Sequence, residues 1–175
     1  MSKFKTAAQK IWEAHRIKSL ENQRDLLLID KIFLHERTGP ALLSGLAIAQ
    51  RPPANPKSIF GTLDHIVDTT TPRSDSTLFE GGKLFIDAFK KRTREFGIQL
   101  FDLEHPYQGI VHVISPELGI ALPGITLVCP DSHTCTVGGL GALAWGVGST
   151  EGEHAVATQT LIYQQPKHQR VIFTG

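Results

Sequence analysis

The chain has 175 residues, of which 41% are hydrophobic and 20% charged, and its formal net charge is +1. These values are typical of a globular protein with one ordinary core, and the near-neutral charge provides no basic surface for nucleic acid. The sequence lacks an apolar stretch near the ~20 residues that span a bilayer, a signal-peptide core in residues 1–6 and a disulfide framework, so we expect a cytoplasmic protein without membrane contact.

Apolar periodicity and turn residues predict helices and strands that alternate along the chain. Helices are predicted over 4–16, 39–50, 84–96 and 151–163. Strands are predicted over 25–35, 58–67, 98–101, 109–114, 125–129 and 170–174. Gly39-Pro40 favours a helix start, because proline lacks an N–H that the first turn does not use. Gly97 favours a helix end.

This alternation predicts an α/β fold with a mainly parallel sheet and helices on both of its faces. The last predicted strand begins only at residue 170, close to the end of the sequence. We therefore expect the sequence to be truncated at this point rather than to reach a natural end.

Reactive side chains occur at or near the ends of four predicted strands. His35-Glu36 closes the first, Asp64-His65 lies within the second, His112 lies in the fourth, and Asp131-Ser132-His133 follows the fifth. In an open α/β sheet, the carboxyl ends of the strands form the binding crevice. Histidine titrates near neutrality, and an adjacent carboxylate can fix its tautomer. Such groups, brought together, are suited to acid–base catalysis on a small polar substrate.

Other interpretations of these motifs are weaker. A Ser-His-Asp hydrolase needs side chains that converge in space, and no Gly-x-Ser-x-Gly motif surrounds Ser132. The glycine-rich stretch 138–148 matches neither a dinucleotide fingerprint nor a phosphate-binding loop. Cys129 and Cys135 are not at zinc-ligand spacing. A histidine such as His112 can also be purely structural.

Three long stretches carry a resemblance to a known family. Residues 95–117 include His105-Pro-Tyr-Gln-Gly-Ile-Val-His112, residues 122–134 include Cys129-Pro-Asp-Ser-His133, and residues 145–161 continue the match. Together they resemble the large subunits of the 3-isopropylmalate dehydratase family, in the aconitase superfamily. The likeness covers essentially the whole chain and implies an aconitase-like three-layer α/β/α fold. It also implies that residues 1–175 are the N-terminal part of a cluster-binding subunit whose later domains, with the cluster cysteines, are absent from this sequence.

The resemblance implies a hydro-lyase of leucine biosynthesis that interconverts 2- and 3-isopropylmalate by dehydration and rehydration. It also implies a [4Fe–4S] cluster in the complete enzyme and a small-subunit partner, with which the large subunit forms a heterodimer. The matching positions imply catalytic roles for Asp64, His65, His112, Asp131 and His133. They imply substrate contacts for His35 and Ser132.

The chain also departs from the family pattern. The three cysteines that hold the cluster are missing, and Cys129 and Cys135 do not occupy their positions, so we expect no metal ligand in this chain. The loop from Asp68 to Ser76 differs as well, which leaves another 2-substituted malate or a homoaconitase-like substrate open. Two alternatives remain: a non-catalytic subunit that binds a small-subunit partner, and a mononuclear metal hydrolase built on His65, His112 and His133.

Overall fold

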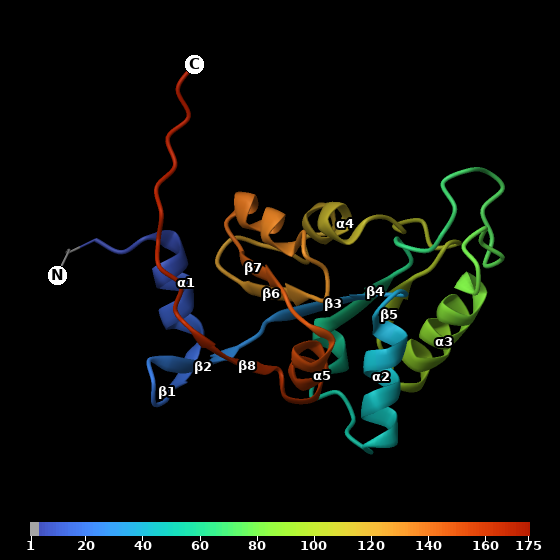
Figure 1. Cartoon of the computed structure of the whole chain (residues 1–175), viewed down its shortest axis with the longest axis horizontal. Helices are drawn as coiled ribbons and strands as arrows, with labels where there is room; N and C mark the ends of the chain where they lie inside the picture. The colour runs from blue at the N-terminus through green and yellow to red at the C-terminus, as the bar shows by residue number, and fades with distance from the viewer. Residues whose placement is uncertain (1–3) are drawn as a thin grey trace.

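The computed structural model describes residues 4–175 (Figure 1). Of residues 1–6, in which we predict no signal-peptide core, residues 1–3 lie outside the described part. Its main sheet has five parallel strands in the order β5–β4–β3–β6–β7. The strands are β3 (Lys31–His35), β4 (Ile59–Thr62), β5 (Gln99–Phe101), β6 (Thr126–Cys129) and β7 (Leu143–Gly146). Parallel neighbours need crossover connections. These contain α2 (Gly39–Ile48), the 3-10 helix η1 (Pro56–Ser58), α3 (Gly82–Glu95), α4 (Val111–Glu117) and the 3-10 helix η2 (Thr134–Leu140).

Both faces of the main sheet are covered, which confirms the predicted three-layer fold (Figure 1). Successive side chains of a strand point to opposite faces, and β3 shows this directly. Ile32 and Leu34 join the core formed with α2, α3 and α5 (Ser149–Thr158), whereas Phe33 joins the core formed with α4 and η2. All three side chains are buried, as expected for a central parallel strand.

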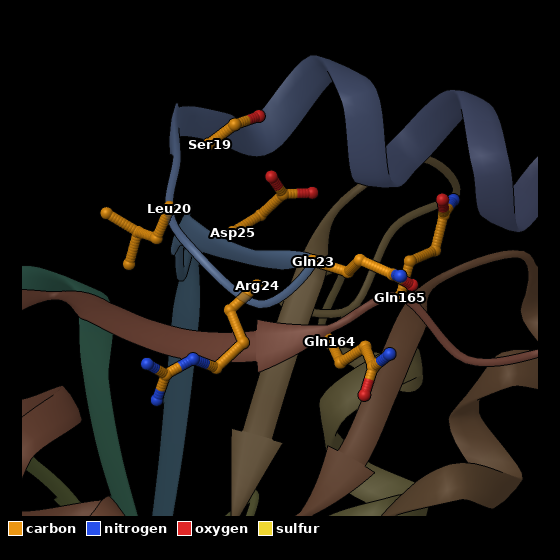
Figure 2. A pocket seen from close by; sticks show the side chains of 7 residues that line it. All are labelled: Ser19, Leu20, Gln23, Arg24, Asp25, Gln164 and Gln165. Carbon is orange, nitrogen blue, oxygen red and sulfur yellow. The ribbon is translucent and has the colours of Figure 1, made fainter.

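A second sheet, which we did not predict, is antiparallel and has the order β1–β2–β8. Its strands are β1 (Arg16–Ser19), β2 (Arg24–Leu28) and β8 (Thr160–Gln164), and α1 (Ala7–His15) packs beside them. Trp12 of α1 is buried, and its indole N–H donates to Asp25 Oδ2 at 2.7 Å. Figure 2 shows a polar pocket of about 320 Å³ between the β1–β2 turn and the end of β8.

Several predicted elements are confirmed, but two predicted segments contain a break. The predicted strand over 25–35 is two strands, β2 and β3, in different sheets. The predicted helix over 151–163 ends at Thr158, because Gln159 adopts a left-handed backbone with φ of 57° and the chain continues as β8. The predicted strand over 58–67 is shorter and ends at Thr62, so Asp64 and His65 lie after it.

Two further strand predictions are wrong. Residues 170–174 form no strand. Residues 109–114 contain the start of α4, so His112 lies on a helix. The β-branched residues there suggest a strand, but contacts with distant residues decide the conformation. Thr62 Oγ1 donates to the Gly109 carbonyl at 2.8 Å, and the Val111 N–H donates to Asp64 Oδ2 at 2.9 Å. Within residues 4–175, none of the helices combines the length and apolarity needed to cross a bilayer.

Candidate active site

The sheet topology brings the predicted site residues to one edge. From β3 the chain proceeds outward to β4 and β5, then returns to β6 on the other side of β3. The point at which strand order reverses is where open α/β sheets bind ligands. His35 ends β3, Asp64 and His65 follow β4, and Asp131 follows β6. Side-chain contacts with His65 join the other three residues.

His65 is the centre of the site. Its Nδ1 lies 2.7 Å from Asp64 Oδ1, and its Nε2 lies 3.1 Å from Asp131 Oδ2. An ionised carboxylate only accepts hydrogen bonds, so hydrogen lies on Nδ1. A second hydrogen on Nε2 would give an imidazolium that faces Asp131 as well. The pKa of His65 is correspondingly raised, mainly by its hydrogen bond with Asp64 and further by the charges of Asp64, Glu36 and Asp131.

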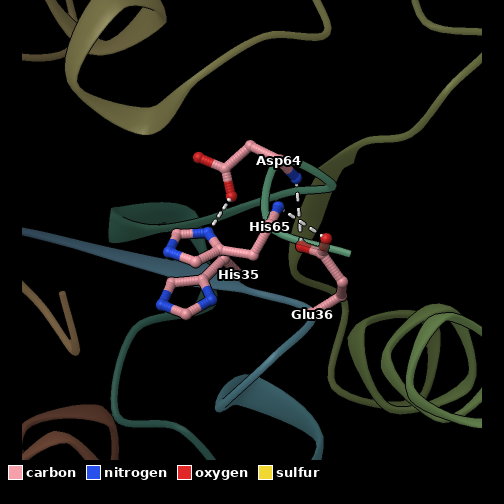
Figure 3. Close-up of side chains that lie close together, drawn as sticks. All are labelled: His35, Glu36, Asp64 and His65. Atoms are coloured by element: carbon pink, nitrogen blue, oxygen red, sulfur yellow. Dashed lines mark hydrogen bonds and ion pairs between the residues drawn. The ribbon is translucent and has the colours of Figure 1, made fainter. Parts of the chain in front are cut away.

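His35 lies flat against His65, with ring centroids 3.7 Å apart and an interplanar angle of 10° (Figure 3). Its Nε2 lies 3.1 Å from the Pro130 carbonyl oxygen, which can only accept, so the proton belongs on Nε2. His35 Nδ1 is buried and has no hydrogen-bond partner among the described residues. Burial, followed by the charge of His65, lowers the pKa of His35. The pKa values of the two stacked rings are thus shifted in opposite directions.

Asp131 links the β6 loop to this pair. Its Oδ1 accepts a hydrogen bond from the His133 N–H at 2.7 Å and lies 3.2 Å from His133 Nδ1. Burial alone would raise the pKa of Asp131, but the His133 N–H and the charges of His112 and His65 lower it. The His133 side chain is 80% exposed, and Ser132 Oγ lies 3.5 Å from His133 Nδ1. In this loop the Asp131 carboxylate is buried, and the His133 imidazole that it contacts is exposed to solvent.

α4 places His112 at the edge of the same site. Its Nε2 lies 3.3 Å from the Oγ1 of Thr134, which begins η2 directly after the Asp131 loop. Burial lowers the pKa of His112, although Asp131 and Asp64 oppose that shift. Two open pockets flank this region. One of about 450 Å³ includes Asp64, and one of about 340 Å³ includes Asp131 and Ser132. The latter depends on Gly146, where a Cβ would lie 2.5 Å from the Asp131 carbonyl oxygen.

The metal-hydrolase alternative requires His65, His112 and His133 to lie together as ligands, and the structure does not group them. Within residues 4–175, one group of side chains has potential ligand atoms all within 4.8 Å: His35, Glu36, Asp64 and His65. Glu36 already accepts backbone N–H groups of Asp64 and His65 (Figure 3). Asp64 accepts the Val111 N–H, and the two nitrogens of His65 face Asp64 and Asp131. His112 and His133 do not belong to this group, so the triad of the metal-hydrolase alternative is not assembled.

The cysteines do not form a ligand set either. Cys129 is fully buried in β6, and burial raises its pKa well above the ordinary value. Cys135 is exposed on η2. Metal ligation requires the thiolate form, which the surroundings of Cys129 oppose.

Comparison with known proteins adds two findings. The sequence model of the family described as "Aconitase family (aconitate hydratase)" matches residues 9–175. The chain is also 47% identical, over 171 residues, to 3-isopropylmalate dehydratase large subunit 1 of Bradyrhizobium diazoefficiens. That alignment covers 98% of this chain and 35% of the relative, so the chain spans about a third of the length of the curated relative it matches.

Proposed function

The chain belongs to the aconitase family, and on this premise we propose that it supplies the Asp/His part of the active site of a 3-isopropylmalate dehydratase. In the complete protein this site takes part in the interconversion of 2- and 3-isopropylmalate by removal and re-addition of water. The observation that carries the proposal is the ring of His65, whose two nitrogens face Asp64 and Asp131 at the carboxyl ends of the strands.

His65 is suited to give a proton to a departing hydroxyl group. Loss of water from a hydroxy acid requires a proton for the leaving oxygen and a base for the proton on the neighbouring carbon. The raised pKa of His65 keeps a proton available, and its side chain is 31% exposed, so it is accessible to a substrate oxygen. Asp131 and Asp64 stabilise the charged ring before the proton leaves and hold its orientation afterwards.

The other three histidines of the site have separate proposed roles. His112, whose pKa is lowered by burial, is neutral at neutral pH and therefore able to accept a proton. His133 has Nδ1 next to Asp131, which places hydrogen on that nitrogen and leaves the exposed side of the ring for substrate. His35 supports the ring of His65 from below, and exposed Ser132 is placed for a polar substrate contact.

A [4Fe–4S] cluster is part of this proposal only through residues outside the chain. Such a cluster needs several thiolates, and Cys129, in the core of the sheet, and exposed Cys135 do not provide them. When bound, the cluster would act as a Lewis acid toward the substrate. A small subunit is the proposed partner, leucine biosynthesis the proposed pathway, and the cytoplasm the proposed location.

Replacement of Asp131 by Asn tests the proposal, because Asn keeps the shape of the side chain but removes the charge that faces His65. In the full-length enzyme assembled with its small subunit, Asp131→Asn and His133→Ala should each lower turnover at least ~100-fold, the usual scale of acid–base catalysis. His168→Ala is the matched control, since His168 is exposed in a stretch without helix or strand. Near-normal turnover in either site variant, with folding intact by circular dichroism, would contradict the assignment.

The intact mass and iron content of the protein, purified anaerobically from its native source, separate catalysis from a scaffold role. A mass well above 19.2 kDa together with bound iron and sulfide supports the dehydratase. A mass equal to that of this chain, without iron, supports the non-catalytic subunit instead.

A further inference from the structure

Glu36 is a fully buried carboxylate at the turn after β3. A buried charge is costly unless hydrogen bonds compensate it, and here the donors are three consecutive backbone N–H groups. Glu36 Oε2 accepts from the Asp64 N–H at 3.0 Å, and Oε1 accepts from the His65 N–H at 2.7 Å and from the Ile66 N–H (Figure 3). The carboxylate is therefore enclosed by the segment that carries the Asp64–His65 pair.

That segment has no regular structure of its own. Residues 64–66 lie outside any helix or strand, and their N–H groups bond to the Glu36 carboxylate rather than to a sheet or helix ladder. Main-chain N–H groups need a partner when they are removed from water. Glu36 supplies that partner from 28 to 30 positions earlier in the sequence. The N–H groups of residues 64–66 consequently share one distant side chain as their acceptor.

The position of the His65 ring follows from this backbone. The ring meets Asp64 and Asp131 at 2.7 and 3.1 Å and lies 3.7 Å from the ring of His35. His35 directly precedes Glu36, so the turn that presents one ring of the stack also anchors the loop that carries the other. We propose that Glu36 is a positioning residue of this site: its carboxylate fixes the backbone of residues 64–66 and through it the ring of His65.

The proposal rests on the proposed function, but it is tested without turnover. Glu36→Gln keeps the size of the side chain, yet its amide nitrogen is a donor that faces N–H donors. The matched control is Glu117→Gln, because Glu117 is exposed at the end of α4. In Glu36→Gln, amide hydrogen exchange at residues 64–66 should become at least about tenfold faster, since bonds to a charged acceptor are the strong class.

The His65 ring provides a readout that a general loss of stability does not move. By NMR titration, the pKa of His65 should fall in Glu36→Gln, and the nuclear Overhauser contact between the His35 and His65 rings should weaken. The charged groups around His65 are Asp64, Asp131 and Glu36, with His35 and His112 opposing protonation. Of these, only Glu36 is changed. Glu117→Gln should alter neither observable.

Two results would overturn the proposal. In Glu36→Gln, unchanged exchange at 64–66 and an unchanged ring contact would show that Glu36 contributes charge at most, even if the pKa of His65 falls. In the unmodified chain, unprotected amides at 64–66 would show that the three hydrogen bonds do not hold the loop, and this measurement remains decisive if Glu36→Gln does not fold. Because neither reads catalysis, failure here is distinct from failure of the Asp131→Asn turnover test.

Discussion

Thr126→Val should destabilise the fold strongly despite its small change in shape. Thr126 is fully buried at the start of β6. Its Oγ1 accepts from the Asp30 N–H at 2.9 Å and donates to the Leu28 carbonyl at 2.9 Å. Valine leaves both backbone groups without these partners. At roughly 1–3 kcal/mol for each unsatisfied buried group, and with some relief from water at partly exposed Asp30, the expected loss is about 2–4 kcal/mol.

Urea unfolding followed by circular dichroism measures this loss. For a slope of about 2 kcal/mol per molar urea, the midpoint should fall by roughly 1–2 M while the slope stays unchanged. Thr70→Val is the control, because Thr70 is exposed in the loop after β4, and it should stay within about 0.5 kcal/mol. Equal midpoints for the two variants would refute the reasoning that Thr126 holds the junction of β2 and β3.

Two further predictions concern titration and thiol reactivity. The pKa of His65 is raised, so its contribution to stability is complete below about pH 6.5 and is lost as pH rises through the folded-state pKa. The pKa values of His35 and His112 are lowered, so their contributions are complete above about pH 6.5 and are lost as pH falls through the folded-state pKa values. The histidine contribution should therefore peak near pH 6.5 in thermal unfolding, and a monotonic increase from pH 5 to pH 8 would contradict it. A chromogenic disulfide reagent should modify exposed Cys135 rapidly and buried Cys129 only on unfolding, so two equally fast thiols would be inconsistent with this structure.

Much of the main sheet could be predicted because local pattern and tertiary role agree there. The apolar run that ends at Cys129 is predicted to be a buried strand, and the structure has the buried strand β6 there. The helix predicted over 84–96 from its amphipathic pattern corresponds to α3, and Gly97, predicted to end it, has φ of 67°. Parallel strands in alternation with helices place strand ends at one edge. From that rule we could predict that His35, Asp64, His65 and Asp131 lie at the same edge, although the predicted bounds of two strands were wrong.

The errors arise where side chains distant in sequence decide the backbone. His112 lies on a helix because Asp64 accepts the N–H of Val111, across 47 positions. The strand over 25–35 divides at Asp30, whose backbone and carboxylate bind Thr126 across 96 positions. Periodicity within a short window contains no information on such partners. The buried role of Glu36 is hidden for the same reason, although an acid directly after a buried strand is an unusual residue there.

The stacked pair of His35 and His65 shows how one site keeps an acid beside a neutral ring. Two imidazolium charges about 4 Å apart would repel by about 4 kcal/mol at an effective dielectric constant near 20, so the stack favours one positive charge over two. The surroundings decide which ring carries that charge. His65 faces two carboxylates, while buried His35 faces the Pro130 carbonyl. Removing the charge of Asp131 therefore weakens the preference for His65, and the acid proposed for dehydration loses its proton at a lower pH.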